Sequence, residues 1–227
     1  MSDALPRTES LTLQALSRLK RDIVLGEYEF GERLNIETLK KRYQMGGTPV
    51  REALNQLVAW SLVEALPLRG FRVASMTAEV VSSLFDSRLF VEERLLTSAL
   101  QASDDEWEAG CIAALHRIRR FLQSEAHSLI SNVGKWFELQ EAFLTRVFRP
   151  AASICLWSFE ERLLVQSMQY ENWLLFRGGD SLVELKKQFQ IYECFLDACM
   201  DKNHELAWSH YGAGIRRVSE LINKEMA

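Results

Sequence analysis

The chain of 227 residues is 48% hydrophobic and 26% charged, with a formal net charge of −4 at pH 7. This is ordinary globular usage, so the chain can bury a substantial core in one large domain or two small ones. No stretch approaches the roughly 18 uncharged apolar residues of a membrane span, and the N-terminal residues lack the apolar segment of a secretory signal. We therefore expect a cytoplasmic protein with no membrane partner.

Charge is unevenly distributed along the chain. Residues 1–75 contain 11 Lys and Arg against 9 Asp and Glu, whereas residues 76–227 contain 16 against 22. A mildly basic N-terminal part fits local contact with DNA, although the asymmetry is a weak signal by itself. The cysteines show no paired spacing and are expected to be reduced thiols. They are Cys111, Cys155, Cys194 and Cys199.

The first predicted helix starts near Ser10, after residues that we expect to be frayed. Its apolar positions recur at helical spacing, and Gly26 ends it. A turn is expected over residues 27–34, with Gly31 as its break. The apolar positions of the helix are Leu13, Leu16, Leu19, Ile23 and Val24.

Two short helices are predicted next. Asn35 is a good N-cap for a helix over residues 36–43, and two glycines separate this helix from the following one. Thr48 is expected to cap the following helix and Pro49 to occupy its first position, where no backbone donor is needed. That helix has an amphipathic stripe. The stripe consists of Val50, Ala53, Leu54, Leu57 and Val58.

Two β-prone runs follow, at residues 62–66 and 70–74, on either side of Pro67. This pattern predicts a hairpin. Three short helices followed by a hairpin form the layout of a winged helix-turn-helix. We therefore predict that residues 1–76 are a winged helix-turn-helix DNA-binding domain.

From residue 77 onward the chain has no strand signal and few glycines or prolines, which predicts an all-α domain over residues 77–227. The fold class is thus mainly α, with three helices and a β-hairpin followed by a helical bundle. The bundle helices are expected at residues 78–101, 105–125, 131–147, 151–175, 181–201 and 204–224.

The second helix of the helix-turn-helix carries the candidate DNA-reading residues. Arg51 and Asn55 lie opposite its apolar stripe, and a guanidinium can offer two donors to guanine in the major groove. The helix N-terminus beside Thr48 favours a phosphate, because its N–H groups are free and the helix dipole is positive there. Further candidates are Lys40, Lys41 and Arg42 for phosphates and Arg69 at the hairpin tip. The alternative for each is a solvated surface charge.

The same region contains a longer signature. It reads Gly47-Thr48-Pro49-Val50-Arg51-Glu52-Ala53-Leu54, then Leu57, Leu62-Val63 and Pro67-Leu68-Arg69-Gly70-Phe71-Arg72-Val73. This signature resembles that of the GntR family of regulators, and the resemblance covers residues 10–75. It implies that Arg51 reads the DNA and that the wing tip at Arg69 and Gly70 contacts it.

One position departs from the family pattern. Members commonly have Ser-Arg before Thr-Pro, and that arginine also contacts DNA, but here the positions are Gly46 and Gly47. Either the operator differs, or the backbone N–H groups of the glycines approach a phosphate directly, which glycine permits.

The predicted bundle contains the segment Phe85-Asp86-Ser87-Arg88-Leu89-Phe90-Val91-Glu92. It is similar to an R-x-x-x-E motif of the FadR-type branch, whose helical effector domain is called FCD, and the weaker resemblance covers about residues 77–225. Arg88 and Glu92 lie on one helix face. They form a plain ion pair, or, as the resemblance implies, Arg88 lies at a ligand pocket and clamps a carboxylate or phosphate.

Many members of this branch hold a metal ion with an acidic residue and three histidines. The corresponding positions here are Gln140, Leu144, Tyr192 and, less securely, Gly214, which form no ligand set. The histidines of the chain do not replace that set. We therefore expect no metal, no cofactor, and a pocket that binds its effector directly. The residues expected to line it are Arg88, Trp136, Gln140 and Tyr192.

The sequence has no Ser/His/Asp arrangement, Gly-rich phosphate loop or paired-carboxylate motif, so we do not expect an enzyme. The resemblance implies a cytoplasmic repressor that acts as a homodimer on a palindromic operator. Its effector is expected to be a small molecule such as an organic acid or an acyl compound. The alternative is a DNA-binding regulator whose C-terminal domain only dimerises and senses no ligand.

Overall fold

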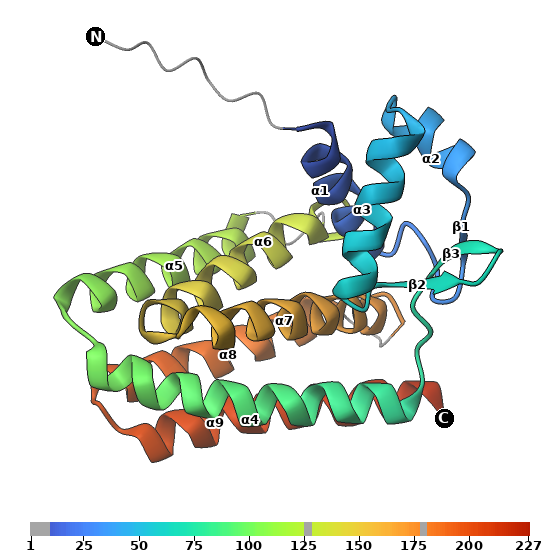
Figure 1. The fold of residues 1–227 in the computed structure, drawn as a ribbon. Helices are drawn as coiled ribbons and strands as arrows, with labels where there is room; N and C mark the ends of the chain where they lie inside the picture. The colour runs from blue at the N-terminus through green and yellow to red at the C-terminus, as the bar shows by residue number, and fades with distance from the viewer. Residues whose placement is uncertain (1–9, 125–128, 178–180) are drawn as a thin grey trace, which may run out of the picture. The chain divides into compact units, whose positions relative to one another are not determined.

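The computed structural model describes residues 10–124, 129–177 and 181–227. The chain divides into two compact units, Met1–Met76 and Thr77–Ala227. Figure 1 shows that the strands belong to the first unit and that the second is built from helices. A mainly α fold with a small sheet in the N-terminal part is thereby confirmed.

Three helices and three short strands make up the first unit. The helices are α1 (Leu11–Val24), α2 (Ile36–Tyr43) and α3 (Gly47–Ala59), and the strands are β1 (Arg33–Leu34), β2 (Val63–Leu66) and β3 (Gly70–Val73). α1 and α3 pack closely together, and the apolar stripe predicted for α3 supplies its side of the core. The stripe predicted for α1 is only partly right, because Leu13 is 48% exposed and Ala15 is buried in its place. The side chains of Leu19, Ile23 and Leu54 are fully buried there.

Side chains satisfy the backbone donors at the start of α1 and α2. Ser10 accepts a hydrogen bond from the N–H of Leu13, and Asn35 accepts from the N–H groups of Glu37 and Thr38. Such caps stabilise a helix end by about 1 kcal/mol. Asn35 was predicted in this role, and the structure confirms it.

The prediction that Thr48 caps α3 is wrong. The helix begins at Gly47, Gly46 occupies the cap position, and no side chain caps the free N–H groups. Thr48 and Pro49 both lie inside the first turn, where a proline costs nothing because those N–H groups have no intrahelical partner. The preceding helix ends at Tyr43, as predicted, and Gln44 follows it with a left-handed backbone of φ +55°.

The sheet contains one strand more than predicted. β3 is its central strand, with β2 on one side as the predicted hairpin and β1 on the other. β1 pairs antiparallel with β3, with Arg33 opposite Arg72 and Leu34 opposite Phe71. The sequence predicted only a turn there, because a strand of two residues is too short to show an alternating pattern.

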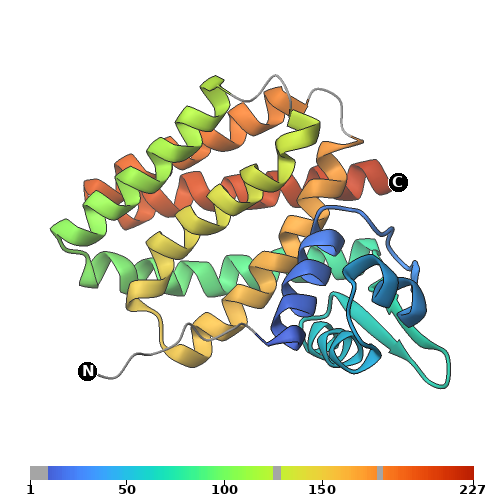
Figure 2. The same ribbon diagram turned by 90° about the horizontal axis from the view of Figure 1, so that it is seen from above.

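The second unit is a bundle of long helices. α5 and α6 lie side by side, as do α8 and α9, and α4 runs along α9 (Figures 1 and 2). The predicted helices are confirmed to within a few residues. The start of α7 lies three residues later than predicted, because a short 3-10 turn at Arg149–Ala151 precedes it. The helices are α4 (Ala78–Ala102), α5 (Asp105–Ser124), α6 (Leu129–Phe148), α7 (Ile154–Leu175), α8 (Ser181–Met200) and α9 (His204–Met226).

Aromatic side chains from α6, α8 and α9 fill the centre of the bundle. The ring centroids of Phe195 and Tyr211 are 4.7 Å apart, and those of Phe143 and Tyr192 are 5.0 Å apart. Rings at these distances attract one another beyond their burial. This cluster fixes the helices around a group of buried polar side chains.

Candidate DNA interface and buried polar network

α3 separates its apolar and polar residues onto opposite faces. Val50, Ala53 and Leu57 are fully buried, whereas Arg51 and Asn55 are exposed. Arg51 has no hydrogen-bond or ion-pair partner among the described residues. Its guanidinium is therefore free to contact another molecule.

The N-terminus of α3 is equally open. Gly46 makes no side-chain cap, and its φ of −68° is one that any residue adopts. A Cβ atom added at Gly46 or Gly47 would meet only side-chain atoms at 3.7 and 3.6 Å, which is ordinary contact. The fold itself therefore does not require glycine at these positions.

The predicted basic residues of α2 differ in their surroundings. Arg42 forms ion pairs with Asp22 at 2.9 Å and Glu27 at 3.0 Å, and Lys40 pairs with Glu37 at 2.8 Å. Lys41 is exposed and has no such partner among the described residues. Arg42 thus ties α2 to the end of α1, while Lys41 is free for an external anion.

The hairpin tip projects Arg69 into solvent between Pro67 and Gly70. Gly70 has a φ of +85°, a conformation that glycine adopts without strain. Arg33, Arg69 and Arg72 line one shallow hollow beside this tip. The sequence did not point to Arg33, because it lies on the strand β1 that was not predicted.

In the helical unit, Arg88 is buried among partners from three helices. Its Nη2 donates to Glu92 Oε1 at 2.9 Å, and its Nη1 donates to Ser167 Oγ at 2.8 Å and to Glu171 Oε1 at 3.3 Å. Tyr211 also donates its hydroxyl to Glu92 at 3.1 Å. The intrahelical ion pair therefore exists, and it is one part of a larger network.

Gln140 extends this network to α6. Its Nε2 donates to Glu171 Oε2 at 2.8 Å, whereas its buried Oε1 has no partner. Tyr192 is also buried, and its ring lies 5.0 Å from that of Phe143 and 6.4 Å from that of Tyr211. The structure thus brings Arg88, Gln140 and Tyr192 into one buried region.

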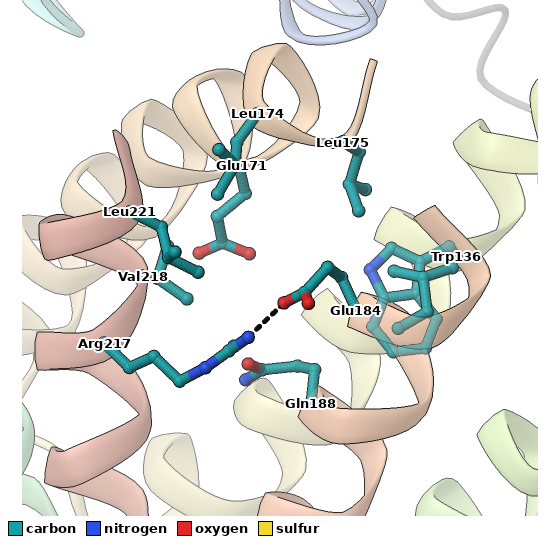
Figure 3. Close-up of a pocket in the computed structure, with 10 residues that line it drawn as sticks. Trp136, Glu171, Leu174, Leu175, Glu184, Gln188, Arg217, Val218 and Leu221 are labelled. Carbon is teal, nitrogen blue, oxygen red and sulfur yellow. Dashed lines mark hydrogen bonds and ion pairs between the residues drawn. The ribbon is translucent and has the colours of Figure 1, made fainter. Parts of the chain in front are cut away.

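Glu171 connects the network to a narrow pocket between α6, α7, α8 and α9 (Figure 3). Trp136 lines this pocket, and Glu184 forms an ion pair with Arg217 across it. The other residues expected at a pocket, Arg88, Gln140 and Tyr192, do not line this one. The pocket volume is about 40 Å³, which is room for little more than water molecules.

Sequence reasoning missed Glu171, Glu184, Gln188 and Arg217. A signal was available for two of them, because Glu184, Gln188 and Tyr192 are spaced four residues apart and so share one face of α8. Among the described residues, no group of three or more His, Cys, Asp or Glu side chains is placed to hold a metal ion.

The network contains more buried carboxyl groups than cations. Glu92 and Glu160 are buried, Glu171 is nearly so, and Arg88 is the cation that they face. Burial raises the pKa of Glu160 well above its ordinary value of 4.5, and the nearby Glu92 carboxylate raises it further. Burial also raises the pKa of Glu171, against the opposing effect of Arg88. In the folded protein Glu160 is therefore expected to hold its proton to a higher pH than an exposed glutamate does.

A Glu160→Gln variant tests this protonation. When folding raises the pKa of a carboxyl group, the free energy of unfolding of the protein falls as the pH rises above the pKa that the group has in the unfolded chain. We expect unfolding in urea, measured between about pH 5 and pH 9, to show that the free energy of unfolding falls less steeply with pH in the variant than in the wild type. The exposed Glu220→Gln serves as a control. An unchanged slope for Glu160→Gln would show that Glu160 is already ionised in the folded protein.

Comparison with known proteins identifies the family. The family model described as bacterial regulatory proteins, gntR family, matches residues 11–73. The HTH-type transcriptional repressor GlaR of Escherichia coli (strain K12) is 34% identical over 152 residues, which cover 67% of this chain and 68% of GlaR. The chain belongs to the GntR family.

Two further likenesses extend beyond the first unit. The HTH-type transcriptional regulator BphR of Paraburkholderia xenovorans (strain LB400) is 32% identical over 161 residues, covering 71% of this chain and 66% of BphR. The solved structure of McbR/YncC of E. coli has a TM-score of 0.81 at 20% identity and covers 97% of this chain and 100% of that one. At this identity the structural likeness concerns the fold.

The GntR member described here is thus a DNA-binding transcription regulator, and its family and relatives are regulators rather than enzymes. No helix within the described residues is long and apolar enough to cross a membrane. The winged helix-turn-helix and the all-helical unit agree with the fold of this family.

Proposed function

We propose that the protein is a cytoplasmic repressor of the FadR-type branch that binds a palindromic operator as a homodimer and responds to a small-molecule effector. In this proposal residues 1–76 bind DNA, and residues 77–227, an FCD-type domain, bind the effector and dimerise. The observation that carries the proposal is the exposed face of α3, where Arg51 and Asn55 lie opposite a fully buried stripe.

The chemistry of that face fits a DNA major groove. Arg51 can donate twice to one guanine, and Asn55, one helical turn later, can pair with a neighbouring base. At the N-terminus of α3, the uncapped N–H groups face outward beside Gly46 and Gly47, so a phosphate can approach the backbone closely. Lys41 and Arg69 are exposed cations that suit flanking phosphates.

Hydroxyl-radical footprinting tests the arrangement of the bound protein on DNA. Two identical heads on a palindrome protect two symmetric patches about one helical turn apart. A single protected patch on a bound fragment would contradict the homodimeric part of the proposal.

Arg88 and Glu171 suggest how an acidic effector acts. Arg88 forms two ion pairs, and the one with Glu171, at 3.3 Å, is the longer. Glu171 also borders the pocket. An effector carboxylate that displaces Glu171 would pair with Arg88 and widen the pocket around Trp136. By thermodynamic linkage, effector and operator then change each other's affinity by the same factor.

A domain that only dimerises is the second candidate function, and the small volume of the pocket favours it. Thermal unfolding of the full chain in a library of organic acids and acyl-CoA compounds separates the two. A true effector raises the melting temperature with the logarithm of its concentration. An unchanged melting temperature across the library would favour the dimerisation-only alternative.

A further inference from the structure

The turn that joins β2 to β3 carries a fully exposed apolar side chain, Leu68, directly after Pro67. The N–H of Arg69 donates to the carbonyl oxygen of Leu66 at 3.0 Å and closes the turn. Figures 1 and 2 show that this hairpin extends away from α1 and α3. A fully exposed side chain packs against nothing in its own unit, so Leu68 does not hold the fold together.

The backbone at Leu68 is also unfavourable for leucine. Its φ of +59° lies in the left-handed region. A turn with proline at its second position and a positive φ at its third usually has glycine or asparagine at the third. Leucine gains no burial here that could offset the strain. The fold therefore gives no reason for a leucine at the tip, whereas contact with another molecule would.

Cations around the tip indicate the chemistry of that molecule. Arg33 and Arg72 lie directly opposite each other on β1 and β3, and together with Arg69 they line the hollow beside the tip. Like charges opposite each other on neighbouring strands repel. Arg72 pairs with Glu64 at 2.6 Å, whereas neither Arg33 nor Arg69 has an ion-pair partner within the described residues. A polyanion that lies along the hairpin would offset this repulsion.

The minor groove of DNA accepts both features of the tip. The groove is about 6 Å wide, and its negative potential attracts arginine. Proteins that kink DNA from this side insert leucine, proline or a similar apolar side chain between two base pairs, and the bent duplex then contacts more of the protein. Pro67 and Leu68 at the tip, with arginines beside them, have this composition.

We propose that Leu68 is an apolar wedge that enters the minor groove and partly unstacks one base step of the operator, while Arg33 and Arg69 bind the phosphates at the edges of the groove. The inference rests on the operator binding of the proposed function and adds a deformation of the DNA. Pyrimidine–purine steps unstack most readily, so the protein selects such a step opposite the tip without a hydrogen bond to its bases. This specificity is independent of Arg51.

Unstacking is measured with 2-aminopurine, a fluorescent analogue of adenine that is quenched while it is stacked. Operator duplexes, obtained by selection from random DNA, carry the analogue at one position at a time. We expect the full-length protein to raise the fluorescence several-fold at one step of each half-site. Energy transfer between dyes at the two duplex ends should rise as well, because an unstacked step kinks the DNA.

Leu68→Gly removes the wedge without harming the turn, because glycine adopts a positive φ without strain. We expect the fluorescence rise and the bend to disappear and the affinity for the operator to fall by roughly tenfold. Leu68→Met keeps an apolar wedge and should retain the bend. Leu206→Ala on α9 removes another exposed leucine and should change none of these signals.

A weakened base step separates a wedge from an ordinary contact. A mismatch lowers the cost of unstacking, so the wild type should bind a duplex with a mismatch at that step about tenfold more tightly than the intact one. Leu68→Gly should bind the two duplexes equally. Arg33→Ala should instead weaken binding to all duplexes alike, and its affinity should depend less on salt, because a phosphate contact is lost.

The possible failures are distinguishable. If the wild type binds the selected operator with no rise in fluorescence at any step, the wedge is wrong and the proposed function stands. If Leu68→Gly unstacks the step as the wild type does, the assignment to Leu68 is overturned. A wild type that enriches no sequence from random DNA overturns the proposed function and this inference with it.

Discussion

Replacing Arg51 by alanine is expected to reduce discrimination between operator and unrelated DNA by about 1–3 kcal/mol, a factor of roughly 5 to 150. The expectation follows from the position of Arg51, which is exposed on α3 and has no partner within the described residues. The loss should fall on the bases that its guanidinium contacts, because a phosphate contact would weaken binding to all sequences alike. Fluorescence anisotropy with operator and scrambled duplexes measures both affinities.

Two variants make this measurement specific. Arg51→Lys keeps the charge but loses the two-donor fork, so it should retain affinity for scrambled DNA while losing discrimination. Arg21→Ala removes an exposed arginine from α1, outside α3, and should leave discrimination unchanged. If Arg51→Ala lowers both affinities by the same factor, Arg51 contacts a phosphate and reads no base.

Replacing Arg88 by alanine is expected to destabilise the helical unit strongly. The change leaves the carboxylates of Glu92 and Glu171 buried without their cation, and breaking a buried pair from one side costs about 3–5 kcal/mol. Urea unfolding followed by circular dichroism measures this loss. The control is Arg119→Ala, which breaks an exposed ion pair with Glu193 and should cost less than about 1 kcal/mol.

A double variant separates charge from packing. Arg88→Met combined with Glu92→Gln removes both charges of the closest pair and keeps similar volumes, so it should be more stable than Arg88→Ala. If Arg88→Ala unfolds at the same urea concentration as the wild type, the network does not hold the helices together.

The helices of the bundle were predictable because each has a long periodic pattern and ends at a recognisable break. The same reasoning found Arg51 and Asn55, since the face opposite a regular apolar stripe must point outward. The start of α3 was misplaced because proline is tolerated throughout the first turn of a helix, so Pro49 did not fix the first position. β1 was missed because its two residues are held by pairing with β3, which local sequence does not reveal.

The buried network was only half predictable. The spacing of Arg88 and Glu92 on one helix shows that they meet, but the contacts with Ser167, Glu171 and Tyr211 join residues far apart in the sequence. Only the packing of α4 against α7 and α9 brings these groups together. For the same reason, Glu171 and Arg217 could not be placed beside Trp136 at the pocket from sequence alone.

Selection of binding sites from random duplex DNA by the full-length protein tests the reading of DNA by α3 most directly. The wild type should enrich an inverted repeat whose half-sites contain a guanine, and Arg51→Ala should lose the preference at that guanine while other positions keep theirs. If the wild type enriches no sequence, or if Arg51→Ala enriches the same one, then α3 does not read DNA through Arg51.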